Sequence, residues 1–275
     1  RALDTIVNRH PALRTVLEHV DGQLFQRVLP CAPLDIQQQD LRALDGPARH
    51  AQAAAQRRRF EALPFDLGVD RMMRAQLLRL DEETWLLLLA VHHVAMDDWS
   101  LDIFLHEFST LYAADDPDES NDPPALPSLP VTYADFSCWQ LARSRRPRWQ
   151  AQLAYWRQHL AGIPATHAIP LDFPRPRTMG ISAFQVTAHL DASVVSRLKS
   201  VARAHDATLF MLIHAALATV ISCWSGEQDI VIGTPVSGRT HAKLTGLIGY
   251  FSNTLALRTQ LDPGMSLSQL LQFNR

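Results

Sequence analysis

An unbroken apolar run, Trp85–Val91, is the feature that most restricts how this chain can fold. The run is too short for a core helix, and it suits a strand that is covered on both faces, as in sheets flanked by helices. A second apolar run, Met72–Leu80, precedes it across a short acidic stretch at residues 81–83. The two segments are therefore predicted to form a hairpin whose second strand is buried on both faces.

This predicted strand carries His92 and His93 at its carboxyl end. From Leu101 to Tyr112, apolar residues then recur at intervals of three and four, which predicts an amphipathic helix after a short polar loop. Strand, polar loop and helix in this order are typical of α/β folds, which commonly hold their functional sites at such junctions.

The rest of the chain mixes helical and strand-like patterns. Helices are predicted at Ala2–Asn8, Gln37–Glu61, Tyr133–Ala142, Trp149–Leu160, Val194–His205 and Leu209–Trp224, and strands at Leu13–Val20, Leu24–Leu29, Phe184–Leu190, Asp229–Thr234 and Phe251–Leu257. The most apolar window, Leu209–Cys223, is shorter than the roughly 20 residues that a membrane span requires. It is interpreted as a buried helix, and no membrane association is expected.

Residues 115–130 are rich in acidic residues and proline and have no periodic pattern, which is typical of a linker. A boundary is therefore expected there, between an N-terminal lobe at residues 1–130 and a partial C-terminal lobe at residues 131–275. The chain begins without Met inside a helical pattern, and it stops within an amphipathic stretch at Leu270–Phe273. It is expected to be a fragment that is truncated at both ends.

The composition is that of an ordinary globular protein, with 47% hydrophobic and 20% charged residues. A net charge of -2 provides no field that attracts a polyanion, so nucleic acid is not an expected partner. Cys31, Cys138 and Cys223 lie far apart in apolar surroundings, which predicts reduced thiols in the core. Together with the absence of a secretion signal at the N-terminus, they indicate a cytoplasmic location.

The polar loop holds the candidate chemistry, in His92, His93, Asp97 and Asp98. Adjacent strand residues point to opposite faces, so the two histidines are not expected to share a role. For the same reason the ligands for a metal ion do not converge, and no metal site is expected. Either histidine could instead be a hydrogen-bonded core residue, and Asp97 could serve only as a helix cap.

Other familiar motifs are missing from the sequence. It contains no Gly-x-Ser-x-Gly elbow, no Gly-x-Gly-x-x-Gly fingerprint and no phosphate-binding loop. A serine hydrolase, a dinucleotide enzyme and an ATPase therefore lack their usual signatures.

The segment from His92 to Ser100 resembles the His-His-x-x-x-Asp-Gly motif of nonribosomal peptide synthetase condensation domains, relatives of chloramphenicol acetyltransferase. Further segments resemble blocks of that family in the same order: Arg9–Thr15, Tyr133–Trp139, Tyr155–Leu160, Gly233–Arg239 and Ile248–Leu255. The similarity covers nearly the whole chain. It implies an α/β, two-lobed chloramphenicol acetyltransferase-like fold with a substrate tunnel between the lobes.

By this resemblance, the catalytic motif comprises His93, His92 and Asp97. It implies that His93 is the catalytic histidine, that His92 is a structural neighbour, and that Asp97 pairs with Arg9. Asp98 and Asn253 are implied as further structural support of the site. Asp98 stands where the family usually has Gly, which adds a side chain and a charge near the site.

The implied reaction forms an amide between a carrier-bound acyl or peptidyl thioester and a carrier-bound aminoacyl acceptor. A free α-amine has a pKa of about 7.7–8.0, so part of it is neutral near pH 7 and a strong base is unnecessary. His93 could act as the general base, or it could position the amine or stabilise the oxyanion. No cofactor is expected to bind directly. Substrates are expected on phosphopantetheine arms or as coenzyme A thioesters.

The implied partners are peptidyl and acyl carrier domains and a neighbouring adenylation domain. A starter condensation domain or a freestanding acyltransferase that loads a fatty acyl group shares the same chemistry and remains an alternative. A noncatalytic recruitment module of the same fold is a further alternative, because related silent domains also end this motif in Asp-Asp; those domains lack the second histidine, which is present here as His93. An epimerisation domain is less favoured, because its Glu-Gly-His-Gly-Arg-Glu segment has no counterpart in the sequence.

Overall fold

A computed structural model describes residues 1–114, 126–178 and 185–273, and these form two compact units. Unit 1 comprises Arg1–Trp149 and Ser237–Asn253, and unit 2 comprises Gln150–Val236 and Thr254–Arg275. The two units therefore divide the chain at other positions than the expected boundary after residue 130. The chain also returns to unit 1 after unit 2 has begun, which local sequence patterns do not reveal.

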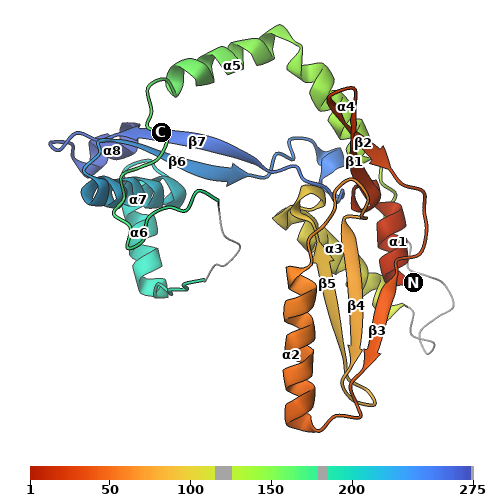
Figure 1. Ribbon diagram of the computed structural model, residues 1–275. Coiled ribbons are helices and arrows are strands. Elements are labelled where there is room, and N and C mark those ends of the chain that lie inside the picture. The colour runs from red at the N-terminus through yellow and green to blue at the C-terminus, as the bar shows by residue number, and fades with distance from the viewer. Residues whose placement is uncertain (115–125, 179–184, 274–275) are drawn as a thin grey trace. The chain divides into compact units, whose positions relative to one another are not determined.

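Unit 1 is built on a three-stranded sheet of order β3-β4-β5 (Figure 1). Its elements are α1 (Ala2–Arg9), β1 (Thr15–Val20), β2 (Gln23–Val28), β3 (Ile36–Asp40), α2 (Gly46–Ala62), β4 (Met73–Arg79), β5 (Trp85–Val91), α3 (Asp98–Ala113) and α4 (Tyr133–Ser144). β3 runs parallel to β4, and β5 runs antiparallel to β4. β1 and β2 form a separate antiparallel hairpin.

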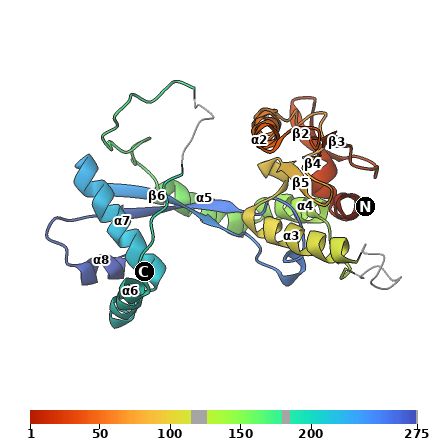
Figure 2. The same ribbon diagram turned by 90° about the horizontal axis from the view of Figure 1, so that it is seen from below.

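The predicted hairpin of Met72–Leu80 and Trp85–Val91 is confirmed as β4 and β5, with Met73 opposite Val91 and Arg79 opposite Trp85. Side chains of β5 alternate between two clusters of buried residues. Leu87, Leu89 and Val91 pack on the cluster formed with α1 and α3, whereas Leu86, Leu88 and Ala90 pack on the cluster formed with α2. Figure 2 shows α2 on one side of the sheet and α3 on the other. Both faces of β5 are covered as predicted, although most of its side chains are only partly buried.

The single helix predicted at Gln37–Glu61 is wrong over its first part, which is the strand β3. Gln37–Asp40 pairs in parallel with Gln76–Arg79 of β4. Glutamine is a good helix former, but intrinsic propensity is a small contribution, and hydrogen bonding to β4 outweighs it. Only the alanine- and arginine-rich segment Gly46–Ala62 is helical, and it begins where the Asp45 side chain accepts a hydrogen bond from the Ala48 amide.

Unit 2 contains β6 (Asp229–Val236), α6 (Ala192–Ala204), α7 (Leu209–Ser225), α8 (Leu267–Phe273) and, from Thr254 onwards, β7 (Asn253–Gln260), which pairs with β6. The helix α5 (Pro147–His159) begins in unit 1 and continues into unit 2. The core of unit 2 joins α6, α7 and α8 through Ala202, Leu212, Ala215, Leu270 and Leu271. No strand forms over residues 185–190, contrary to the prediction for Phe184–Leu190, and residue 184 lies outside the described residues.

The segment Leu209–Cys223 is a helix as predicted, but it is not buried all round. α7 packs against α6, α8 and β6 along one stripe only, which includes Leu212, Ala215 and Ala218. Its opposite side, with Phe210, Ile213 and Trp224, is exposed in the described structure. No single helix within the described residues is long and apolar enough to cross a membrane; α6 and α7 reach that length and composition only together, and they are bent by 97°.

Two further predictions concern the cysteines and the linker. Cys31, Cys138 and Cys223 are free thiols, but all three are exposed, so their assignment to the core is wrong. Cys31 lies in an irregular segment after β2, and the other two occupy outward positions on α4 and α7.

Most of the predicted linker, residues 115–125, lies outside the described residues, and 126–130 has no regular structure.

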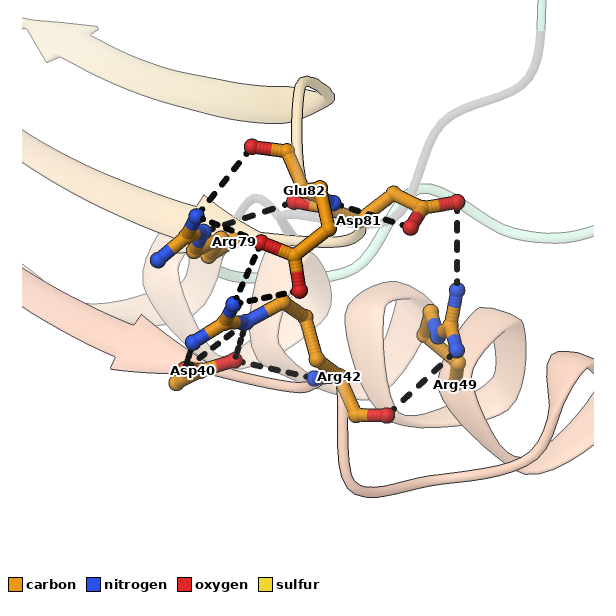
Figure 3. Close-up of polar contacts among 6 residues, drawn as sticks. All are labelled: Asp40, Arg42, Arg49, Arg79, Asp81 and Glu82. Carbon is orange, nitrogen blue, oxygen red and sulfur yellow. Dashed lines mark hydrogen bonds and ion pairs between the residues drawn. The ribbon is translucent and has the colours of Figure 1, made fainter.

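A group of charged side chains surrounds the end of the sheet where β3 and β4 finish and β5 begins (Figure 3). It comprises Asp40, Arg42, Arg49, Arg79, Asp81 and Glu82. The Arg42 guanidinium binds Asp40 (Nη2 to Oδ2, 2.7 Å) and Glu82 (Nη1 to Oε1, 2.7 Å), and Arg79 Nη2 donates to Glu82 Oε2 at 3.1 Å. Hydrogen bonds from Arg42 lower the pKa of Asp40 from 3.8 to about 2.

This shift gives a testable pH dependence. A carboxyl group whose pKa is lower in the folded state stabilises that state above pH 3.8, and this contribution is lost as the pH falls towards 2. In Arg42→Gln, the pKa of Asp40 should rise towards 3.8, because the donor that favours the carboxylate is removed. Carboxyl ¹³C NMR titration measures this directly. An unchanged Asp40 titration in the variant would show that Arg42 is not the cause.

Candidate active site

The two histidines follow β5 directly, where the strand gives way to a short 3₁₀ turn at His93–Ala95. The His92 amide still donates to the Met72 carbonyl at 2.9 Å, so strand pairing continues by one residue. His92 Nδ1 accepts a hydrogen bond from the Val94 amide at 3.1 Å, which caps the turn. Because an amide can only donate, the proton of a neutral His92 is on Nε2. The ring lies edge-on to Phe65, with centroids 5.7 Å apart.

His93 has the opposite tautomer. Its Nδ1 lies 2.6 Å from the Met96 carbonyl oxygen. A carbonyl can only accept, so Nδ1 carries the proton and the lone pair of the neutral ring is on Nε2. The side chain is exposed, and the ring of Tyr250 stands perpendicular to it with centroids 5.2 Å apart. In this tautomer a histidine can accept a proton at Nε2, as a general base does, while its Nδ1 proton stays bound to the backbone carbonyl.

Asp97 is the N-cap of α3, and its carboxylate is almost fully buried. Oδ1 accepts from the Ser100 amide at 2.9 Å, and Oδ2 accepts from the Phe251 amide at 3.0 Å. The Asp97 amide in turn donates to the Gly249 carbonyl at 3.3 Å. Asp97 is therefore a helix cap, as one interpretation of the sequence held, and it also binds a segment about 150 residues away in the chain.

The ion-pair partner of Asp97 is Arg239, with Nη2 3.0 Å from Oδ1 and both side chains only 1% exposed. The other terminal nitrogen of Arg239 donates to the carbonyls of Leu244 (2.5 Å) and Leu247 (2.8 Å). The face of the guanidinium lies over the Phe251 ring, 4.0 Å from its centroid. Arg239 thus binds the capped end of α3 and orders the segment that leads to residue 248.

The expected pairing of Asp97 with Arg9 is wrong. Arg9 Nε binds Glu107 Oε1 at 3.0 Å instead. Arg9 is the last residue of α1, and α1 packs against α3. Ten residues separate Glu107 from Asp97 on α3, which is about 15 Å along a helix axis. Arg9 therefore meets the middle of α3, whereas Asp97 lies at its beginning.

The Ser100 hydroxyl lies at the centre of this network. It accepts from Arg239 Nη2 at 2.7 Å and from the Gly249 amide at 3.1 Å. Its single proton has two acceptors within reach, Asp97 Oδ1 at 2.7 Å and the Gly249 carbonyl at 2.8 Å. Each buried polar atom of the serine hence has a partner, which is what keeps such a buried site stable.

Two glycines permit the close approach of these segments. Gly238 has a φ of 63°, and a Cβ there would lie 2.0 Å from the Phe251 carbonyl oxygen. A Cβ on Gly249 would lie 2.2 Å from Cδ2 of Tyr133, whose hydroxyl donates to the Tyr250 carbonyl at 2.7 Å. Any larger residue at either position would push the 248–251 segment away from Asp97.

The two residues predicted as further support of the site have different positions. Asp98 is the first residue of α3 and is exposed. Its φ is not positive, so the backbone there does not require Gly. Asn253 is the first residue of β7, two residues beyond Phe251, and its side chain is also exposed.

The electrostatics of Asp97 follow from its partners. Burial by itself raises the pKa of this carboxyl, but hydrogen bonds from Ser100, Phe251 and Arg239 outweigh it and hold the pKa below its usual range. Burial and the nearby Asp97 charge raise the pKa of the Tyr133 hydroxyl. Within the described residues no group of His, Cys, Asp and Glu side chains is placed to bind a metal ion.

Sequence reasoning missed three residues of this arrangement. Arg239 lies in a segment that shares the family pattern, yet nothing local to it indicates its partner. Glu107 carried a usable signal, because it is an acid on the apolar face of the predicted helix, three residues after Phe104. For Ser100 the sequence indicates only a position in the first turn of a helix, three residues after the capping Asp97. Its contacts with Arg239 and Gly249 depend on tertiary structure and could not be predicted locally.

The buried pair predicts strong coupling between Asp97 and Arg239. Asp97→Asn or Arg239→Gln alone should lower the free energy of unfolding by about 3–5 kcal/mol, because each leaves the other charge buried without its partner. The double variant should lose less than the sum, with a coupling energy of about 1–3 kcal/mol in a double-mutant cycle. Denaturant unfolding measures all four proteins. Asp102→Asn, at an exposed position on the same helix, is the matched control, and purely additive losses would contradict the pairing.

Comparison with known proteins identifies the family. A family model described as "Condensation domain" matches residues 1–274. Phosphinothricin tripeptide synthetase PhsC of Streptomyces viridochromogenes is 36% identical over 98% of this chain, which spans 25% of that protein. Among solved structures, the X-domain from teicoplanin biosynthesis is 28% identical with a TM-score of 0.84, covering 99% of this chain and 60% of that one.

A four-domain nonribosomal peptide synthetase bound to AMP and glycine is 25% identical, with a TM-score of 0.80 over 99% of this chain and 20% of that one. The chain thus spans less than two thirds of the length of each of these relatives. Their similarity confirms the predicted α/β fold of the chloramphenicol acetyltransferase-like type. This chain belongs to the condensation-domain family of nonribosomal peptide synthetases.

Proposed function

We propose that this chain forms an amide bond between an acyl or peptidyl thioester donor and the amine of an aminoacyl acceptor, both delivered on phosphopantetheine arms of carrier domains. The observation that carries the proposal is the state of His93. Its Nδ1 proton is bound by the Met96 carbonyl, which leaves the Nε2 lone pair available on an exposed ring. Family membership supports the same reaction class.

In the proposed reaction the acceptor nitrogen attacks the thioester carbonyl carbon. His93 Nε2 takes a proton from that nitrogen, so the new C–N bond forms without leaving a positive charge on the amine. The tetrahedral intermediate then expels sulfur, the C–S bond breaks, and the proton passes from His93 to the leaving thiolate. Much of the rate comes from holding the two tethered substrates together, since effective molarity contributes about 7–11 kcal/mol in well-oriented reactions.

Asp97, Arg239 and Ser100 act on this chemistry without touching the reacting atoms. They fix the start of α3, and Met96 immediately precedes Asp97 in the chain. The orientation of the Met96 carbonyl, and with it the His93 tautomer, therefore depends on the buried network. His92 has a structural role in the proposal, because its Nδ1 caps the turn.

The proposal extends to partners and location. Carrier and adenylation domains would supply the donor and acceptor, as the multidomain synthetases among the relatives suggest. A reaction on such carriers, together with the free thiols at Cys31, Cys138 and Cys223, supports a cytoplasmic location. A starter role or a coenzyme A thioester donor would use the same residues, and the donor carrier accepted in vitro separates these variants of the reaction.

A noncatalytic module is the second candidate, favoured by the similarity to the X-domain from teicoplanin biosynthesis. The Asp97-Asp98 pair in the motif points the same way. Against it, His93 is present and has the tautomer that a base requires. Amide formation by the full-length protein would exclude this alternative.

The catalytic role of His93 is tested by His93→Ala in the full-length protein. Amide formation from a donor thioester and an aminoacyl carrier, followed by mass spectrometry, should fall about 100-fold or more, because general acid–base catalysis is removed. Circular dichroism should be unchanged, since the ring is exposed. His19→Ala, at an exposed position of β1, is the control and should keep full activity. Near-normal turnover in His93→Ala would contradict a catalytic role for His93.

Asp98→Gly restores the residue that the family usually has and tests whether the departure matters. We expect amide formation to be kept or raised, because Asp98 is exposed and a negative charge near the developing oxyanion is removed. Stability should fall by only about 0.3–1 kcal/mol, the effect of an acid in the first turn of a helix. Steady-state kinetics with matched carriers measures the first effect. A large loss of activity would give Asp98 a positive role.

A further inference from the structure

We propose that His10 is a positioning residue for His93: its imidazole holds the segment 248–251 in place, and that segment sets the surroundings of the catalytic ring. The inference rests on the proposed function of His93. It concerns a buried histidine, a buried glutamate and an arginine that the reaction itself does not use.

The geometry of His10 defines its protonation. The side chain is 1% exposed and bonds through both ring nitrogens. Nδ1 accepts from the Ile248 amide at 3.2 Å, and Nε2 lies 2.9 Å from Glu107 Oε2. Because the amide can only donate, the proton is on Nε2 and points at the carboxylate. His10 is therefore a fixed link between a main-chain amide of one segment and an acid on α3.

Glu107 fixes the orientation of that link. Its side chain is 7% exposed, and its other oxygen accepts from Arg9 Nε at 3.0 Å. Burial raises the pKa of Glu107, but the hydrogen bonds from His10 and Arg9 and the positive charge of Arg9 outweigh it and hold the pKa below its usual range. Arg9 also donates to the Pro127 carbonyl. The carboxylate remains an acceptor for the His10 proton, which prevents the imidazole from turning away from Ile248.

The segment held by His10 continues directly to the catalytic ring. After Ile248, Gly249 bonds to Ser100 and Asp97, and the Phe251 amide bonds to Asp97 Oδ2. Tyr250 lies between these anchors, with its ring perpendicular to His93. Asp97 and Ser100, at the start of α3, bind the segment at Gly249 and Phe251. His10 binds it at the Ile248 amide. Without the His10 bond, the first residue of the segment would lose its side-chain anchor.

A histidine with a structural role only would be equally buried. The test must therefore remove the hydrogen bond of each ring nitrogen separately. His10→Asn places an amide oxygen near the position of Nδ1 and keeps an acceptor for Ile248, while losing the donor to Glu107. His10→Gln places an amide group near the position of Nε2 and keeps the donor to Glu107, while losing the acceptor. The two variants remove one hydrogen bond each, so their losses of stability should be similar.

We expect His10→Gln to lower kcat of the full-length protein about 10- to 100-fold, since small misplacements of a site cost this much. KM for the carriers should change less than kcat. His10→Asn should retain activity within about threefold of the wild type, because the bond on which positioning depends is kept. Hydrogen exchange at the amides of residues 248–251 should accelerate in His10→Gln and stay near the wild-type rate in His10→Asn.

Equal losses of kcat in the two variants, in proportion to their stability, would overturn the proposal. So would unchanged exchange at residues 248–251 in His10→Gln. Hydrogen exchange is independent of turnover, which separates this inference from the proposed function: a wild-type protein that makes no amide contradicts the function, whereas the exchange pattern still decides whether His10 holds the segment.

Discussion

The buried ion pair of Asp97 and Arg239 is the interaction on which the site depends. Two charges that are each 1% exposed need hydrogen-bond partners, and within the described residues every terminal nitrogen and oxygen of the pair has one, whereas Arg239 Nε has none. The amides of Ser100 and Phe251, the Ser100 hydroxyl and the carbonyls of the 244–247 segment provide those partners. Several of these partners lie in residues 237–253, where the chain returns to unit 1 after it has formed most of unit 2.

The buried ion pair also affects His93, through the peptide bond between Met96 and Asp97. Asp97 caps α3 and accepts the Phe251 amide, so the carbonyl of Met96 has little freedom to rotate. That carbonyl determines which nitrogen of His93 carries the proton. A network that contributes no atom to the proposed reaction thereby determines the state of the proposed base. Under the proposed function, stability and catalysis are coupled here through hydrogen-bond geometry.

Local patterns in the sequence were sufficient for β4, β5 and α3, because the continuous apolar run of a strand covered on both faces and the period of an amphipathic helix are properties of short segments. They failed for β3, whose glutamines become a strand only through pairing with β4. They also failed for the partner of Asp97. Arg9 and Arg239 are equally basic in the sequence, and the choice depends on where each segment meets α3. The catalytic role of His93 stays a prediction.

α3 carries two buried acids, and each of them fixes a different point of the 248–251 segment. Asp97 accepts the Phe251 amide directly, and Glu107 acts on the Ile248 amide through His10. Apolar side chains of similar volume could stabilise the packing of this region equally well. They could not orient a main-chain amide, because hydrophobic contact has no direction, whereas a hydrogen bond does. The ionic residues of α3 are therefore best understood as determinants of placement, with Tyr250, which faces His93, as the residue they place.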